Sequence, residues 1–528
     1  MNSQGSAGRG TATAPSLPAP SPEAERMGHE QHFNTDHLLS NLKRRTISSG
    51  AVTTAAQGAK FLLSVVSTMI LARLLTPRDF GLVAMVTTVT GFMWVFKDAG
   101  LSIATIQREK ITQAQVSNLF WINVGISVLC SVIIVVAAPL IGRFYHNSRL
   151  IPIALFLSAT FIVSGSTIQH QALLKRQMRF RALASIDVSS MLIGAVVGIV
   201  MAFRGYSYWS LVASSLATEI MSLLLTWSVS SWRPQLPTRG SGIGPLVSFG
   251  FHRAAGDFIL FVARGTDNLL IGRVYGSAAV GLYSRASALL LAPLQQLLLP
   301  INAVFMPALC RLQSQPARYR STFLRLYETI ALASFVFSGL FLALARPITL
   351  VLLGPKWEQA AVIFAGFTVA AFCVPLANAS AWLFISQGRG REMFVTQLIN
   401  ACAVVVSFVV GLPFGPVGVA MAFSVSNLLV RIPIYYFNAG RRGPVRTADL
   451  WRILFRHLPL WAAIFAVTSL TRMLVVNWAP LSQLLICVPT ALLTTALLIS
   501  SFSPQRRVAA QLFATIRELK KKPMPESA

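Results

Sequence analysis

Long apolar runs follow one another along almost the whole chain, and they constrain its fold more than any other feature. Cut at charged residues, glycine and proline, the sequence gives about fourteen runs, each close to the roughly 20 residues that one helical bilayer crossing needs. Their predicted ranges are 50–72, 80–97, 117–141, 150–170, 183–203, 207–230, 246–271, 279–309, 327–352, 359–386, 393–411, 414–437, 453–474 and 480–502. The runs predict an all-α, polytopic transmembrane protein, because helices satisfy every backbone polar group inside lipid.

The composition supports a membrane protein. Hydrophobic residues make up 54% of the chain and charged residues only 12%, whereas a soluble domain has about 25% charged residues. The net charge of +28 would suggest nucleic acid in a soluble chain, but here the basic residues lie in short loops, so no nucleic-acid partner is expected. The five cysteines are scattered and distant from histidine, so neither a disulfide framework nor a metal site is predicted.

The distribution of Lys and Arg predicts the orientation in the membrane. With the N-terminus inside, the inner loops and tails carry 31 of these residues and the outer loops carry 9. Basic residues concentrate on the cytoplasmic side of membrane proteins. We therefore expect both termini in the cytoplasm.

Two internal repeats indicate that the chain consists of two related halves. LARLLTPRDFGLV at 71–83 and IGRVYGSAAVGLY at 271–283 share an Arg and a Gly-Leu pair at an offset of 200 residues. GYSYWSLVASS, which starts at Gly205, resembles GPVGVAMAFSV, which starts at Gly415. The first run then corresponds to the seventh, and the halves share one orientation, which predicts two pseudo-symmetric six-helix lobes around a central cleft.

The repeats and the composition together divide the chain. The predicted parts are a disordered, basic cytoplasmic tail at 1–45, an N-terminal six-helix lobe at 46–235, a C-terminal six-helix lobe at 236–440, two additional helices at 450–503, and a basic cytoplasmic tail at 504–528. The first tail is rich in Pro, Ala, Ser and Gly. Its end, DHLLSNLKRR, fits either an interfacial helix or a simple basic tether.

One apolar run, 246–272, carries four charges. Arg253, Asp257, Arg264 and Asp267 share one helical stripe at about 100° per residue. One interpretation is that they neutralise each other as neighbouring pairs along the helix. The other is that the stripe faces the cleft and that Arg253 and Arg264 bind an anion through bidentate hydrogen bonds.

Other charged residues within the runs join this hypothesis. Lys60 lies about 15 Å into the first run, and together with Arg285 it extends the predicted set of anion-binding cations. Glu219, near the middle of the sixth run, and Asp257 are the predicted ion-coupling residues.

Two further acids lie near predicted cytoplasmic ends. We expect Asp187 and Glu328 to pair with nearby Arg181 and Arg325, respectively.

The eighth run contains three prolines at intervals of seven residues. Pro293, Pro300 and Pro307 each remove a helical hydrogen bond. The interval fits either a hinge that bends during function or a fixed curvature.

Four segments resemble a known family. LARLLTPRDFGLVAM at 71–85, DAGLSIATIQRE at 98–109, QALLKRQMRFRALA at 171–184 and GPVGVAMAFS at 415–424 are similar to the Wzx-type polysaccharide flippases of the MOP superfamily, among them the colanic-acid and succinoglycan exporters. The resemblance implies a bacterial inner-membrane protein that moves polyprenyl-pyrophosphate-linked oligosaccharides to the periplasmic leaflet for exopolysaccharide, lipopolysaccharide or capsule synthesis. It also implies ion-coupled alternating access, contact with membrane lipids, and a polysaccharide polymerase and a chain-length regulator as partners to look for.

Two other functions are weighed against this one. A cation-coupled, MATE-like exporter of small molecules would favour an acidic and aromatic cleft, whereas the set of Lys60, Arg253, Arg264 and Arg285 favours an anion. A membrane polysaccharide polymerase or glycosyltransferase would need a large outer loop, and the predicted outer loops are short. The chain has no GxxxxGK, HExxH or GxSxG motif, so no catalytic residue and no cofactor are predicted.

Overall fold

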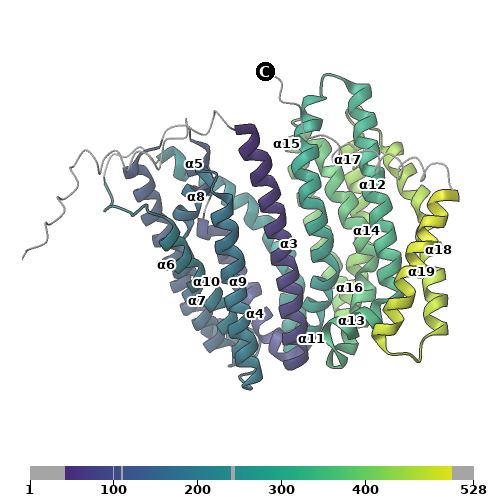
Figure 1. Ribbon diagram of the computed structural model, residues 1–528, viewed down its shortest axis with the longest axis horizontal. Coiled ribbons are helices and arrows are strands. Elements are labelled where there is room, and N and C mark those ends of the chain that lie inside the picture. Colours follow the sequence, from purple (N-terminus) through teal and green to yellow (C-terminus); the bar gives the residue numbers. More distant parts are fainter. Residues whose placement is uncertain (1–41, 99, 109–110, 239–243, 502–528) are drawn as a thin grey trace, which may run out of the picture.

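The computed structural model describes residues 42–501 except 99, 109–110 and 239–243. Within its helices, the side chains of 42–49, 95, 104, 244–264, 295–304 and 501 are outside the description. The predictions for most of the first tail and for the last tail therefore lie outside the described residues. Every regular element in the described part of the chain is a helix, which confirms the all-α prediction (Figure 1).

The first half of the chain, here called the N-lobe, contains α3 to α10. These helices are α3 (Leu42–Leu74), α4 (Pro77–Asp98), α5 (Leu101–Gln107), α6 (Gln113–Phe144), α7 (Leu150–Gly165), α8 (Ile168–Arg176), α9 (Phe180–Phe203) and α10 (Trp209–Val229). The short helix α5 continues the span that α4 begins, and α8 continues the span that α7 begins. The eight helices of the N-lobe therefore make six spans.

The second half, here called the C-lobe, contains α11 to α17 and is followed by α18 and α19. These helices are α11 (Gly244–Arg311), α12 (Pro316–Ala343), α13 (Ala345–Leu353), α14 (Glu358–Ser386), α15 (Gly390–Gly411), α16 (Gly415–Ser426), α17 (Ile432–Gly440), α18 (Thr447–Leu474) and α19 (Pro480–Ser501). A π-helical turn at Asn427–Arg431 joins α16 to α17.

Fourteen predicted spans correspond to twelve continuous apolar segments in the described residues. Two segments each hold two spans. In α11, Gly276 has φ 77° and ψ −175° and separates the helix into two arms; this left-handed conformation costs glycine little. In the segment 390–440 the chain folds back after α15, and α16 approaches α15 so closely that a Cβ atom at Gly411 would lie 2.6 Å from the carbonyl oxygen of Gly418.

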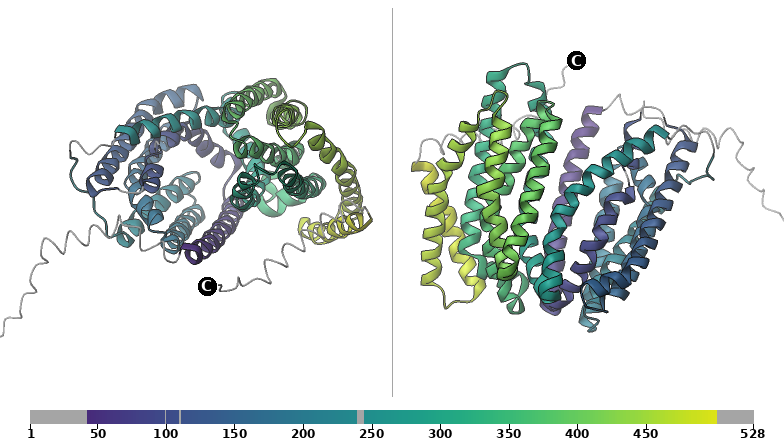
Figure 2. Two further views of the ribbon diagram at one scale, coloured as in Figure 1. Left: turned by 90° about the horizontal axis from the view of Figure 1, so that it is seen from above. Right: turned by 180° about the vertical axis from the view of Figure 1, so that it is seen from behind.

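The two lobes lie side by side, with α18 and α19 on the outer side of the C-lobe (Figure 2). The outward surfaces carry many exposed large apolar residues, for example Leu129, Val136 and Leu140 on α6 and Leu470 on α18. Soluble proteins rarely expose such continuous apolar surfaces. This exposure is typical of helices that contact lipid.

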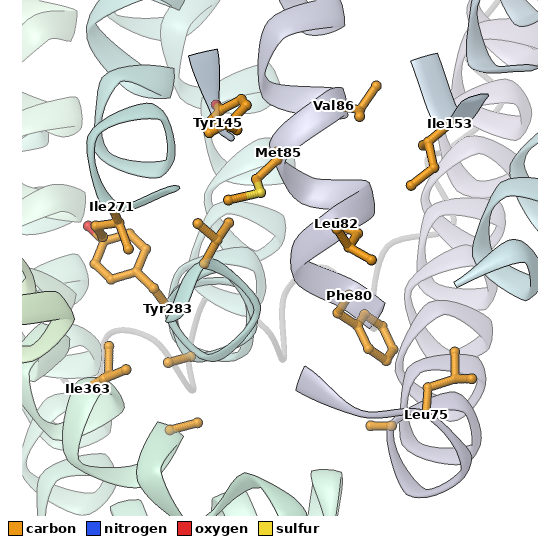
Figure 3. Packing of buried hydrophobic residues seen from close by; sticks show 14 of the residues in the cluster. Leu75, Phe80, Leu82, Met85, Val86, Tyr145, Ile153, Ile271, Tyr283 and Ile363 are labelled. Atoms are coloured by element: carbon orange, nitrogen blue, oxygen red, sulfur yellow. The ribbon is translucent and has the colours of Figure 1, made fainter. Parts of the chain in front are cut away.

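The lobes meet where α4 crosses the second arm of α11. A Cβ atom added to Gly81 would lie 1.6 Å from the carbonyl oxygen of Ser277, and one added to Gly281 would lie 1.8 Å from that of Pro77. These four positions are related by the predicted offset of 200, so the contact is reciprocal and confirms the repeat. Figure 3 shows Met85 of α4 together with Ile271 and Tyr283 of α11 in the apolar cluster that spans both lobes.

Candidate functional site

A cavity of about 690 Å³ opens inside the N-lobe. We call it the N-lobe cavity. Helices α3, α4, α7, α8, α9 and α10 form its walls, and thirteen of its lining residues are Ser or Thr. Hydroxyl groups both donate and accept hydrogen bonds, so this surface can hold water or a hydroxylated ligand. Its five charged lining residues are Lys60, Lys97, Asp187, Glu219 and Arg285.

Lys60, which was predicted to face the central cleft, lines the N-lobe cavity and is paired. Its Nζ lies 2.8 Å from Oδ2 of Asp187 on α9. The expected pairing of Asp187 with Arg181 is therefore wrong, because α3 packs along α9 and brings Lys60 closer. Glu328 likewise pairs with Arg456 of α18, at 2.8 Å, rather than with Arg325.

Lys97, the last residue of the predicted run 80–97, is a cavity residue that was not among the predicted site residues. Its Nζ lies 3.5 Å from the centroid of the Trp94 ring and donates to the Ser164 hydroxyl on α7. Glu219 of α10, predicted to couple ions, contacts the same Ser164 hydroxyl. A buried lysine therefore faces a carboxylate across one hydroxyl. The signal was present in the sequence, since Lys97 lies one helical turn after Trp94.

Arg285 belongs to the second arm of α11 in the C-lobe, yet it lines the N-lobe cavity. Its guanidinium lies 5.2 Å from the centroid of the Phe80 ring, and its Nε is buried without a hydrogen-bond partner. Among the described residues no carboxylate forms an ion pair with it. Cations over aromatic faces are stabilised modestly, so Arg285 keeps its capacity to bind an anion.

A second cavity, of about 410 Å³, lies inside the C-lobe. We call it the C-lobe cavity. It was not predicted. Its charged lining residues are one acid, Asp267, and one base, Arg431, and three amide side chains also line it, from Asn378, Gln397 and Asn400. Tyr283 lies beside Asp267 in the lining.

The second arm of α11 separates the two cavities. Tyr283, Ser287 and Leu291, spaced at intervals of four, line the C-lobe cavity, while Arg285 lines the N-lobe cavity. Residues four apart share one face of a helix and residues two apart do not. The cavities are thus about one helix diameter apart, roughly 10 Å.

Side chains join the lobes at one end of the molecule, here called the closed end. Lys356 Nζ donates to the carbonyl oxygens of Arg73, at 3.2 Å, and Leu74, at 3.4 Å. Arg73 in turn donates to the carbonyl oxygen of Val351 at 3.0 Å, and the indole of Trp357 donates to Ala72 at 2.8 Å. Basic groups thus cap the carbonyl ends of α3 and α13 reciprocally.

The remaining predicted residues divide into two groups. The side chains of Arg253, Asp257, Arg264 and Pro300 lie outside the described residues. Pro293 and Pro307 are in the second arm of α11, which continues as a helix past both of them.

A family model described as a polysaccharide biosynthesis protein matches residues 70–362 of the chain. This chain belongs to that family. The lipopolysaccharide biosynthesis protein WzxC of Escherichia coli (strain K12) is 23% identical over 443 residues, which cover 81% of this chain and 88% of WzxC. The succinoglycan biosynthesis transport protein ExoT of Rhizobium meliloti (strain 1021) is 27% identical over 65% of this chain and 69% of its own.

Solved structures show the same fold as this member of the polysaccharide biosynthesis family. The lipid II flippase MurJ in an inward closed conformation has a TM-score of 0.68 at 13% identity and covers 85% of this chain and 99% of its own. An inward-facing multidrug resistance MATE transporter of the MOP superfamily has a TM-score of 0.57 at 14% identity, over 76% of this chain and 99% of its own. The fold expected from the sequence is therefore confirmed, and the chain is a multi-pass membrane protein.

Proposed function

We propose that this protein is a flippase for polyprenyl-pyrophosphate-linked oligosaccharides in the bacterial inner membrane. Membership of the polysaccharide biosynthesis family supports the substrate class. The observation that carries the proposal is Arg285, a cation without an acidic partner among the described residues, which reaches from the C-lobe into a cavity of the N-lobe.

The charges of the N-lobe cavity support an anionic ligand. Asp187 neutralises Lys60, and Glu219 faces Lys97 across Ser164, which leaves Arg285 as the excess cation. A pyrophosphate inside the membrane needs such a partner, because an unpaired ion buried away from water is very costly. The guanidinium can bind two phosphate oxygens at once.

The closed end supports alternating access. We propose that it faces the periplasm, as the bias of basic residues toward the other side favours, with both termini in the cytoplasm. Substrate would then enter from the cytoplasm while Arg73 and Lys356 keep the lobes together. Glu219, and Asp257 outside the described side chains, remain the proposed ion-coupling residues, and Pro293, Pro300 and Pro307 remain the proposed hinge of α11.

Transport by the purified protein tests this proposal. Lipid-linked saccharides extracted from cells that lack the protein would be reconstituted with it in liposomes, and their exposure to an external lectin followed over time. Loss of one hydrogen-bonding charge costs about 1.5–3 kcal/mol, so Arg285→Ala should slow exposure about 10- to 100-fold, and Arg285→Lys less.

The matched control is Arg273→Ala. Arg273 is on the first arm of the same helix, 5.8 Å from the Phe144 ring, and lines neither cavity. If wild-type protein moves no saccharide, or if Arg285→Ala and Arg273→Ala behave alike, the proposed function or the proposed role of Arg285 is wrong.

The alternative function is a cation-coupled exporter of small molecules, which the MATE-like fold favours. An exporter of organic cations would be impeded by Arg285, so Arg285→Ala would leave its transport unchanged or faster. Uptake of a fluorescent organic cation by the same liposomes separates the two functions. The polysaccharide polymerase and the chain-length regulator remain proposed partners.

A further inference from the structure

The polar groups of the C-lobe cavity are balanced in charge and rich in amides. Asp267 and Arg431 contribute one charge of each sign, and Asn378, Gln397 and Asn400 add three amides. Each amide offers both donors and acceptors in a fixed plane. This set suits a neutral ligand with many groups that both donate and accept, and it offers no net attraction to a strongly charged one.

One of these amides has an unused acceptor. The Asn400 side chain is 3% exposed, and its Nδ2 donates to the carbonyl oxygen of Thr396 at 2.8 Å, whereas its Oδ1 has no partner. A buried polar atom without a hydrogen bond costs about 1–3 kcal/mol. A ligand hydroxyl that donates to Oδ1 would remove this cost.

Aromatic side chains, together with aliphatic ones, form most of the rest of the lining. Phe408 and Phe423 stack with ring centroids 5.6 Å apart, and Phe367 meets Phe423 at 5.9 Å. Such faces pack against the C–H faces of a sugar ring, while the amides reach its hydroxyls. A hydrocarbon tail would fit the aromatic faces alone and would leave Asn400 Oδ1 desolvated without a partner.

The backbone is irregular beside this cavity. The π-helical turn at Asn427–Arg431 precedes Pro433, which lacks the N–H group that a regular turn would use. Arg431, at the end of this turn, donates to Asn427 Oδ1 and lies over the Phe423 ring, at 6.0 Å from its centroid. Such π-helical turns within α-helices are frequent at functional sites.

From these observations we infer that the C-lobe cavity is a carbohydrate site, which binds an uncharged part of the glycan. The inference rests on the proposed function for the nature of the substrate, but it concerns a cavity separate from that of Arg285. At about 410 Å³ the cavity lies within the range of small-ligand pockets, about 300–1,000 Å³.

Calorimetry with two probes tests the inference on the purified full-length protein in lipid nanodiscs. The first probe is a mixture of neutral oligosaccharides released by mild acid from the polysaccharide of the same cells, and the second is inorganic pyrophosphate. The double variant Asn378→Ala/Gln397→Ala should weaken oligosaccharide binding at least tenfold and leave pyrophosphate binding unchanged. Arg285→Gln should do the opposite.

Two controls keep the result specific. Asn438→Ala removes an amide of α17 that lies outside the cavity lining and should change neither affinity. Retained pyrophosphate binding shows that the double variant is folded. If the double variant does not keep it, the single variants Asn378→Ala and Gln397→Ala take its place, each expected to weaken oligosaccharide binding about threefold or more.

Three results would overturn the inference. One is oligosaccharide binding that the double variant leaves unchanged. Another is a wild-type protein that transports lipid-linked saccharide but does not bind the oligosaccharides. The third is a wild-type protein that binds sodium ions or an alkyl chain but not the oligosaccharides, with this binding lost in the double variant. Failure of the proposed function looks different, because the wild-type protein would then transport no lipid-linked saccharide.

Discussion

The two cavities occupy opposite faces of one helical arm in two halves that share a repeat, yet their linings differ. Hydroxyl groups and five charged residues line the N-lobe cavity, whereas amides, aromatic rings and one charge of each sign line the C-lobe cavity. The backbone of the repeat has been kept, as Gly81 and Gly281 show, while the side chains that face the cavities have diverged. Symmetry of the fold therefore does not imply symmetry of binding.

The largest expected effect concerns the feature that both lobes share. Gly81→Ala and Gly281→Ala each place a methyl group within 2 Å of a backbone oxygen, which cannot move as a side chain can. Each should lower the unfolding free energy by about 3 kcal/mol or more. Thermal unfolding in detergent measures the loss.

Gly58→Ala is the control, because a Cβ atom there meets no atom within 4 Å. It should be neutral or slightly stabilising in the helix. Equal effects at Gly81 and Gly281 are expected from their reciprocal contact, and a harmless substitution at either position would contradict the contact.

A smaller effect is expected at the ionic network of the N-lobe cavity. Glu219→Ala leaves the buried Lys97 without its carboxylate, so the abundance of the protein in the membrane should fall, at a cost of about 3 kcal/mol. Lys97→Met/Glu219→Ala should recover abundance, since both charges are removed. If Glu219 couples ions, transport should stay low in the double variant, and recovered transport would limit Glu219 to a structural role.

The closed end should contribute less. Lys356→Ala removes hydrogen bonds to the exposed carbonyl end of α3, each worth about 1 kcal/mol. The fraction of molecules in which the two lobes are separated at the closed end should rise several-fold. Distances between spin labels on the two lobes, measured by electron spin resonance, would show this change. Arg346→Ala is the matched control, because Arg346 pairs with Glu358 within the C-lobe. Equal shifts in both variants would argue against a role of Lys356 in closure.

The smallest effect is expected for Lys60 and Asp187. Both side chains are about one-third exposed, at 31% and 38%, and solvent screens such pairs. A double-mutant cycle with Lys60→Ala and Asp187→Ala should give a coupling free energy of about 1 kcal/mol or less. A coupling free energy of about 3 kcal/mol, as expected for the buried Lys97 and Glu219, would contradict the view that solvent weakens the Lys60–Asp187 pair.

Local patterns in the sequence predict the fold well. Apolar runs define the spans, and the Arg and Gly-Leu matches around Gly81 and Gly281 predict the repeat, whereas the crossing of α4 and α11 at these glycines comes from the structure. The pairing of Lys60 with Asp187 spans 127 positions and depends on how α3 packs on α9, which no local pattern contains. Lys97 was missed because it is the last residue of the apolar run 80–97, although a lysine side chain extends back along its helix.

The C-lobe cavity was missed for a related reason. Asn378, Gln397 and Asn400 are single polar residues within apolar runs, and only the packing of α14 and α15 with α11 brings them to one surface. Isolated amides are common in membrane helices, where they hydrogen-bond to neighbouring helices. Their convergence is a property of the tertiary structure.

The glycine contact between the lobes also affects how one lobe can move over the other. At Gly81 and Gly281 backbone lies directly against backbone, while side chains pack between the helices beside this point, as Phe80 does against Arg285. Helices normally pack ridges into grooves, and a change of crossing angle must lift side chains out of those grooves. Here α4 and α11 have no side chains to separate at the crossing point itself, but contacts beside it, such as that of Phe80 with Arg285, would have to change. The glycine contact thus sets a pivot: a rotation of one lobe over the other would keep the helices in contact there and exchange the side-chain contacts around it.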